Sequence, residues 1–324
     1  ITILATGVGV VSESTPEVLS MARRYGMRVE EHAALIEICR YWQNKSAEDT
    51  CWKWGTLHPE YDTLVNFKNA VLMAADMEYG NRHGRSVTNY QIVFEKGFQG
   101  MIDRCKELIA ANVADGTAVD KVAYWQATIY AIEGVQIWVR KYAAEATRLA
   151  SLEKDAEQKA VFEAMAARLE WISSNPPRDF MEALQLHWTC QLEVYNEMQG
   201  SGFSPGRLGQ VLYPYWKEDI DNGRITREQT LEVLECMRVK YTELEIATCA
   251  GTTGILAGNT FNNICLGGVK PDGSSAENEL EYLFIQAAIN CPTVSPTLSI
   301  IYDGRLSNTF LQKGIECNKT GCGM

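Results

Sequence analysis

Residues 175–216 constrain this chain more than any other stretch, because they join a buried helix to a glycine-rich turn and an aromatic run. Pro176 and Pro177 stop any helix that comes before them. Apolar side chains then recur at the three- and four-residue spacing of one buried helical face, at Leu184, Trp188, Leu192 and Tyr195. The glycine-rich segment 200–206 ends this helix, and the apolar run 211–216 follows it. Packing alone does not require this order.

The chain before this stretch predicts helices almost throughout. Amphipathic patterns indicate helices at 14–26, 29–42, 64–79, 89–111, 119–149 and 152–173. Gly97 and Gly100 are expected to interrupt the fourth of these helices. Strands and helices do not alternate here, which argues against a Rossmann fold.

The chain after it mixes helices with short strands. A helix is expected from Thr226 to Tyr241, and two more at 276–289 and 307–319. Apolar runs rich in strand-forming residues lie between the helices, at 264–266 and 297–302. Short buried strands separated by helices indicate parallel βα units. The predicted fold class is therefore α/β, and the absence of a linker or repeat favours one domain.

Composition disfavours several kinds of partner. The 46% of hydrophobic residues can form a sizeable core, and the net charge of −11 argues against nucleic acid or an anionic membrane. No stretch is apolar enough to span a membrane, and residues 1–11 lack the basic start of a signal peptide. Ten cysteines occur without a CxxC pair. We interpret them as reduced thiols in a reducing, anaerobic cytoplasm, with no metal site.

The turn 200–206, GSGFSPG, is the first candidate site. It lacks the spacing of a phosphate loop and follows a helix where such a loop follows a strand, which disfavours nucleotide binding. One interpretation is a plain turn. The other is a substrate site, in which the hydroxyls of Ser201 and Ser204 lie beside backbone N–H groups and hold a carboxylate. Arg207 is expected to brace the turn, because a guanidinium can bind several carbonyl groups or a carboxylate.

Other positions have a structural and a functional interpretation. Phe261 stands between small and polar residues in GNTFN, and from the sequence alone it is interpreted as a core residue. Glu193 and Glu197 lie four residues apart on one helical face, but no Glu-x-x-His partner accompanies them. A solvated face is therefore favoured over a carboxylate metal site. His83 belongs to the polar turn NRHGR.

The order of these motifs resembles a known family. PPRDFMEALQL, SPGRLGQVLYPYW and DIDNGRITREQTLEVLECM, followed by GNTFNNICLGGVKPDGSSAENELEYLF and SPTLSIIYD, are similar to the pyruvate formate-lyase-like part of the glycyl radical enzymes. The resemblance implies a ten-stranded α/β barrel. Residues 175–324 would form its first half-barrel and 1–174 a helical layer packed outside it, both within one pyruvate formate-lyase-like domain.

Within that family the sequence is similar to the arylacetate decarboxylases, through Gly209 after Gly-Arg-Leu and through AGNTFN. By this resemblance Ser201 contacts the substrate carboxylate, with Ser204 beside it, and Phe261 lies against the substrate. His83 falls near a position from which some relatives bring a polar residue toward the substrate. The radical Cys and Gly of the family are expected beyond Met324. The chain would then be an internal piece that lacks the Cys loop and the glycyl radical domain and is not active alone.

The function implied by the resemblance is a glycyl radical lyase that decarboxylates an aryl acetate, such as 4-hydroxyphenylacetate, to a methyl arene by thiyl radical chemistry. The glycyl radical would be installed by a separate activating enzyme that uses S-adenosylmethionine and an iron–sulfur cluster. Further partners would be a small aromatic acid as substrate, other copies of the chain and, in some members, a small subunit. Two alternatives stay open. One is a fumarate-adding arylalkylsuccinate synthase, or another glycyl radical lyase or dehydratase. The other is a non-catalytic scaffold derived from the fold.

Overall fold

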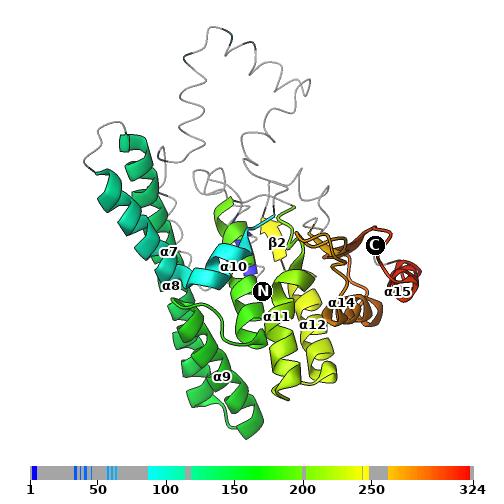
Figure 1. Ribbon diagram of the computed structural model, residues 1–324. Coiled ribbons are helices and arrows are strands. Elements are labelled where there is room, and N and C mark those ends of the chain that lie inside the picture. The colour runs from blue at the N-terminus through cyan, green and yellow to red at the C-terminus, as the bar shows by residue number, and fades with distance from the viewer. Residues whose placement is uncertain are drawn as a thin grey trace. The chain divides into compact units, whose positions relative to one another are not determined.

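The computed structural model describes residues 2–5, 87–113, 118–198, 202–242, 244–247 and 262–321, with single positions between 33 and 63 (Figure 1). The chain divides into two compact units. The first comprises Ile1–Val87, Val194–Arg207 and Glu228–Met324, and the second comprises Thr88–Glu193 and Leu208–Arg227. The helices expected at 14–26, 29–42 and 64–79 lie almost entirely outside the described residues. Within the described part, no helix is long and apolar enough to cross a bilayer.

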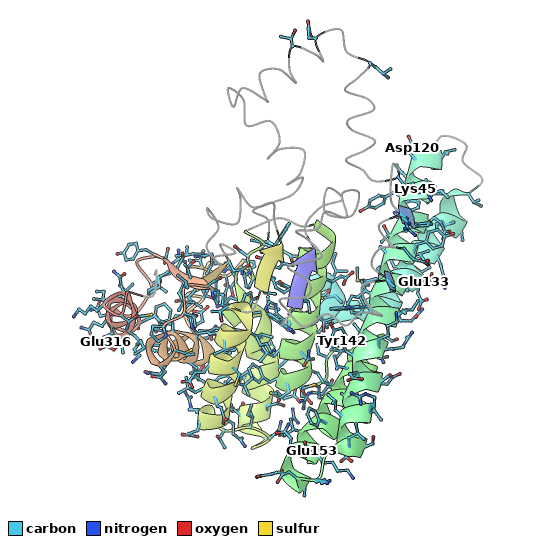
Figure 2. All side chains as sticks on the ribbon, turned by 180° about the vertical axis from the view of Figure 1, so that it is seen from behind. Lys45, Asp120, Glu133, Tyr142, Glu153 and Glu316 are labelled. Atoms are coloured by element: carbon cyan, nitrogen blue, oxygen red, sulfur yellow. The ribbon has the colours of Figure 1, made fainter. Side chains whose placement is uncertain are left out.

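The second unit is helical. Its elements are α7 (Tyr90–Asn112), α8 (Val119–Leu152), α9 (Ala156–Ile172), the first part of α10 (Phe180–Met198) and α11 (Leu208–Asp221). Helix α8 lies beside α7 and beside α9 in Figure 1, and Asp120, Glu133 and Tyr142 mark the course of α8 in Figure 2. Ile129, Ile132 and Val139 are buried along α8, and Leu184 and Leu192 along α10. The helices predicted for 89–173 and the helix after Pro177 are confirmed.

Gly97 interrupts α7, as the sequence predicts. Its φ is +65°, and a Cβ at this position would lie 2.5 Å from the carbonyl oxygen of Ser174. The backbone N–H of Gln99 donates to that same oxygen at 2.9 Å. The kink therefore needs glycine for both its backbone conformation and its close approach to residue 174. Gly100 keeps helical geometry, because φ and ψ are non-helical within α7 only at Gly97.

The boundary between α8 and α9 differs from the prediction of a helix that starts at residue 152. Helix α8 continues to Leu152, and α9 begins only at Ala156. Asp155 caps α9, since its side chain accepts a hydrogen bond from the backbone N–H of Gln158 at 2.8 Å. The carboxylate of Glu153 accepts from the backbone N–H groups of Lys154 and Asp155. These local side-chain bonds replace helical ones and set the break.

The run 211–216 is part of helix α11, an element for which the sequence suggested no assignment. Leu208, Leu212 and Trp216 recur every four residues and are fully buried. Pro214 lies inside this helix and removes one of its hydrogen bonds. The burial of three large apolar side chains on one face outweighs that loss.

The first unit contains α12 (Arg227–Thr242) from Glu228 onward, α14 (Glu279–Asn290), α15 (Asn308–Asn318) and two pairs of strands. Strand β1 (Thr2–Ala5) pairs with β2 (Leu244–Ala247), and β3 (Asn263–Gly267) pairs with β4 (Thr297–Ile301). Both pairs are parallel, as expected for βα units. Asn278 caps α14 and Ser307 caps α15 through their side chains. The strands predicted at 264–266 and 297–302 and the helices predicted around them are confirmed.

Candidate functional site

The second half of the predicted turn runs beside β3. Gly206 forms a parallel bridge with Ile264. Its N–H donates to the carbonyl of Asn263 at 3.3 Å, and the N–H of Cys265 donates to the carbonyl of Gly206 at 2.8 Å. Gly206 has a φ of +65°, and a Cβ there would lie 2.5 Å from Cγ1 of Val87. The glycine thus lets the chain leave the turn and pair with the edge of β3.

Ser204 is the predicted substrate-binding residue that the structure describes. Its Oγ accepts a hydrogen bond from the backbone N–H of Asn263 at 3.1 Å. A serine hydroxyl that accepts at its oxygen keeps its proton for donation to another group. Ser204 is half-buried, so this donor can serve a ligand oxygen. The other predicted residues, Ser201, Phe261 and His83, lie outside the described residues.

Arg207 braces the junction between the turn and β3, as expected. Its Nη1 donates to the carbonyl of Val269 at 2.8 Å, and its Nη2 donates to the carbonyl of Gly267 at 2.9 Å. The N–H of Gly267 donates to the carboxylate of Glu281 at 2.9 Å. Glu281 is fully buried on α14. Gly267 is therefore held at its carbonyl by the Arg207 guanidinium, in a charge-assisted bond of the stronger kind, and at its N–H by the buried carboxyl group of Glu281.

Arg238 braces the other strand of the pair. This side chain is almost fully buried. Its guanidinium donates to the carbonyl groups of Cys291, Thr293 and Pro296 at 2.9, 3.2 and 3.2 Å. These carbonyls belong to the segment that leads into β4. Two arginines therefore hold the backbone around the β3–β4 pair, through bonds that a lysine could not reproduce.

One face of the β3–β4 pair is polar. Register places Asn263 opposite Thr297 and Cys265 opposite Ser299. The Nδ2 of Asn263 donates to Thr297 Oγ1 at 2.9 Å and to Ser299 Oγ at 2.8 Å, and the thiol of Cys265 donates to Asn263 Oδ1 at 3.2 Å. Burial raises the pKa of Cys265 and the charge of Arg207 only partly offsets this, so the thiol stays protonated. The buried face carries Ile264, Leu266 and Leu298.

Sequence reasoning missed this polar row, which we define as Asn263, Cys265, Thr297 and Ser299. The signal for it was the alternation of polar and apolar residues along both strands. That alternation shows which residues share a face of one strand. It does not show which two strands are neighbours, so the hydrogen bonds of Asn263 across the pair could not be inferred.

Two titratable groups of α10 are buried and uncharged. Burial lowers the pKa of His187 to about 3, and its ring packs edge-on against Tyr90 with 4.8 Å between ring centroids. Burial, with a smaller effect of the Glu193 charge, raises the pKa of Cys190 to about 12. A neutral imidazole and a protonated thiol suit packing in a core. The described cysteines, at positions 105, 190, 236, 265, 291 and 317, are free thiols.

Comparison with known proteins relates this geometry to one family. The family model described as pyruvate formate lyase-like matches residues 10–324. The 4-hydroxyphenylacetate decarboxylase glycyl radical subunit of Clostridioides difficile is 39% identical, over all of this chain and 36% of that protein. The indoleacetate decarboxylase of Tractidigestivibacter scatoligenes is 37% identical, over 92% of this chain and 34% of that protein. The chain thus spans about a third of the length of these curated relatives.

A solved structure supports the same fold. The glycerol-bound glycerol dehydratase of Clostridium butyricum superposes with a TM-score of 0.78 at 24% identity, covering 91% of this chain and 37% of that one. This likeness confirms the α/β fold class expected of the glycyl radical enzymes. At this level of identity it carries no information about the substrate.

Proposed function

The chain belongs to the pyruvate formate lyase-like family, and from this premise we propose that the full-length protein is a glycyl radical lyase that decarboxylates an aryl acetate, such as 4-hydroxyphenylacetate. In this reaction the bond between the methylene carbon and the carboxylate breaks. Carbon dioxide leaves, the electron pair of the broken bond stays on the methylene carbon, and one proton, taken in net terms from solvent, completes the methyl group of the arene. The relatives named as decarboxylases match along nearly all of the chain.

The observation that carries the proposal is the hydrogen bond from the Asn263 N–H to Ser204 Oγ. Ser201 is three residues before Ser204, and Phe261 is two residues before Asn263. Because two or three residues span at most about 7–11 Å, this bond supports the proposal that Ser201 and Phe261 contact the same substrate.

We assign the carboxylate to the hydroxyls of Ser201 and Ser204, and the ring to Phe261. Hydroxyl donors hold a carboxylate without adding a charge that would favour retaining it over releasing carbon dioxide. Aromatic pairing adds about 0.5–1.5 kcal/mol beyond the area buried. His83 is proposed as a further polar contact. These residues bind and orient the substrate, which is the positioning that brings reacting groups together.

The glycyl radical would supply the unpaired electron, and we place the radical Gly and Cys outside this chain. None of the described cysteines with a resolved shift has a lowered pKa: burial raises the pKa of Cys190 and that of Cys265. Both thiols are therefore suited to packing and hydrogen bonding. The proposed partners are an activating enzyme that uses S-adenosylmethionine and an iron–sulfur cluster, further copies of the chain and a small subunit. The proposed location is the cytoplasm.

The polar row on β3 and β4 favours one alternative. Four hydrogen-bonding side chains on one strand face could bind a substrate with more oxygen atoms than an aryl acetate has. A fumarate-adding arylalkylsuccinate synthase, or a glycyl radical dehydratase or lyase for a small polar compound, would use such a face.

A substrate panel separates these functions. The full-length protein, activated to a radical content known from electron paramagnetic resonance, is incubated with phenylacetate, 4-hydroxyphenylacetate and indoleacetate, with toluene plus fumarate, and with glycerol. We expect toluene, cresol or skatole from an aryl acetate. Phe261→Leu should lower that rate several-fold at equal radical content, because the leucine lacks a flat ring face. A succinate adduct or a dehydration product, without any methyl arene, would move the assignment to the alternative.

A further inference from the structure

Tyr195 touches both segments that lead to the proposed substrate contacts. It lies near the end of α10 and is 1% exposed. Its ring and that of Phe203 pack in a T-shaped arrangement, with 5.5 Å between ring centroids and 87° between ring planes. Its hydroxyl is hydrogen-bonded to Oδ1 of Asn262. Phe203 follows Ser201 by two residues, and Asn262 directly follows Phe261.

Asn262 is held through its side-chain amide and its backbone carbonyl. Its Nδ2 donates to Ser295 Oγ at 3.4 Å. Its carbonyl accepts from the N–H and from the hydroxyl of Thr297, at 2.9 and 3.1 Å. Asn262 is fully buried and Ser295 nearly so. With Oδ1 of Asn262 on the Tyr195 hydroxyl, Nδ2 lies toward Ser295, so one side-chain amide links the tyrosine to the segment before β4.

We propose that Tyr195 is a positioning residue, which couples the turn that carries Ser201 to the strand start that carries Phe261. The inference rests on the proposed function, because it assigns the purpose of the coupling to those two substrate contacts. Buried polar networks of this kind specify one arrangement of the segments that they join. Tyr195 would then set the placement of the carboxylate contact relative to the ring contact of an aryl acetate. It would do so without touching the substrate itself.

The chain offers a matched control for this role. Tyr90 is also buried, at 3% exposed. Its hydroxyl donates to Gln191 Oε1 at 2.6 Å. Tyr195→Phe and Tyr90→Phe therefore remove the same hydroxyl from the same kind of buried bond. The rings of both tyrosines keep their packing, so each variant is expected to fold. Only the first change releases Asn262.

In the activated full-length protein we expect Tyr195→Phe to lower kcat/KM for an aryl acetate about tenfold, mainly through kcat, at unchanged radical content. Tyr90→Phe should lower it less than twofold. In the background of Phe261→Leu, the added Tyr195→Phe change should cost little more, because residues that act through each other show non-additive effects. An effect of Tyr195→Phe equal to that of Tyr90→Phe, or one that is fully additive with Phe261→Leu, overturns the inference.

Hydrogen exchange tests the coupling without turnover. Peptides that cover 202–206 and 262–266 should exchange faster in Tyr195→Phe and at the wild-type rate in Tyr90→Phe. Unchanged exchange at both peptides overturns the coupling, whatever the activity. Failure of the wild-type protein to act on any aryl acetate overturns the proposed function instead, and the exchange rates still decide whether Tyr195 couples the two segments.

Discussion

The Oγ of Ser204 lies 3.1 Å from the backbone nitrogen of Asn263 and accepts its hydrogen bond. This contact joins a turn to a strand start 59 residues later in the chain. It brings together two segments that are separate motifs in the sequence. The proposed site depends on this contact.

Ser204→Ala should lower stability by about 1–3 kcal/mol, because it leaves the part-buried N–H of Asn263 without its acceptor. Ser299→Ala is the matched control, since Ser299 accepts from the same asparagine through Nδ2 but is exposed. Thermal unfolding of the full-length variants and kcat/KM for an aryl acetate measure both effects. The Ser204 variant should lose more in each measurement. Equal losses in the two variants would show that Ser204 has no special role.

Gly97→Ala should destabilise the full-length protein by more than about 2 kcal/mol. Alanine at a φ of +65° is strained, and its Cβ would lie 2.5 Å from the Ser174 oxygen. Gly134→Ala is the control, because a Cβ at that exposed position in α8 meets nothing within 4 Å. It should stabilise the helix by about 0.5–1 kcal/mol. The thermal midpoints should therefore shift in opposite directions, and a shift in the same direction would refute the account of the kink.

Arg207→Lys should destabilise the turn, because one ammonium group cannot bind the carbonyls of both Gly267 and Val269. The lost charge-assisted bond is worth about 1.5–3 kcal/mol. Arg305→Lys is the control, since that exposed side chain pairs with the nearby Asp303 and should cost less than about 1 kcal/mol. Limited proteolysis and thermal unfolding compare the two variants. A milder effect at Arg207 than at Arg305 would contradict its bracing role.

His187 should make stability depend on pH below neutrality. Burial lowers its pKa to about 3 in the folded protein, against an ordinary value of about 6.5. Between these values the unfolded chain binds more protons, so the free energy of unfolding falls as pH falls, by up to about 1.4 kcal/mol per pH unit. This part of the stability is fully present above pH 6.5 or so.

The check compares wild type with His187→Gln by denaturant unfolding from pH 7.5 down to pH 5. The unfolding free energy of wild type minus that of His187→Gln should stay constant above about pH 7. Below about pH 6 this difference should fall, because wild type loses the stability that depends on His187. A difference that is independent of pH over this whole range would show that His187 ionises normally in the folded protein.

The strongly periodic parts of the fold could be predicted from sequence. Helix α10 was marked by Pro177 before it and by its buried leucines, and β3 and β4 by short apolar runs between turns. Helix α11 was not assigned, because Pro214 and the aromatic residues around it weaken the helical pattern. The sequence pattern puts the start of α9 at residue 152 and not at Ala156, because the capping bond of Asp155 competes with helix continuation at a single residue.

The site was predictable in part. Arg207 was expected to bind carbonyl groups, and it binds those of Gly267 and Val269. Ser204 could be named from its hydroxyl, but its bond to Asn263 could not, because that bond requires the register between distant segments. The same limit hid the polar row and the bond between Tyr195 and Asn262. The sequence shows which hydrogen-bonding side chains are present. The pairing of distant segments determines which of them contact one another.

The most direct test of the proposed function follows the carboxylate carbon of the substrate. The activated full-length protein is given 4-hydroxyphenylacetate with a heavy-carbon label in the carboxylate, and mass spectrometry measures the labelled carbon dioxide and the methyl arene together. The account predicts that both products form in equal amounts, in proportion to radical content, and that Ser201→Ala lowers both at an unchanged radical signal. A full radical signal with no labelled carbon dioxide, from this substrate or from equally labelled phenylacetate and indoleacetate, would contradict it.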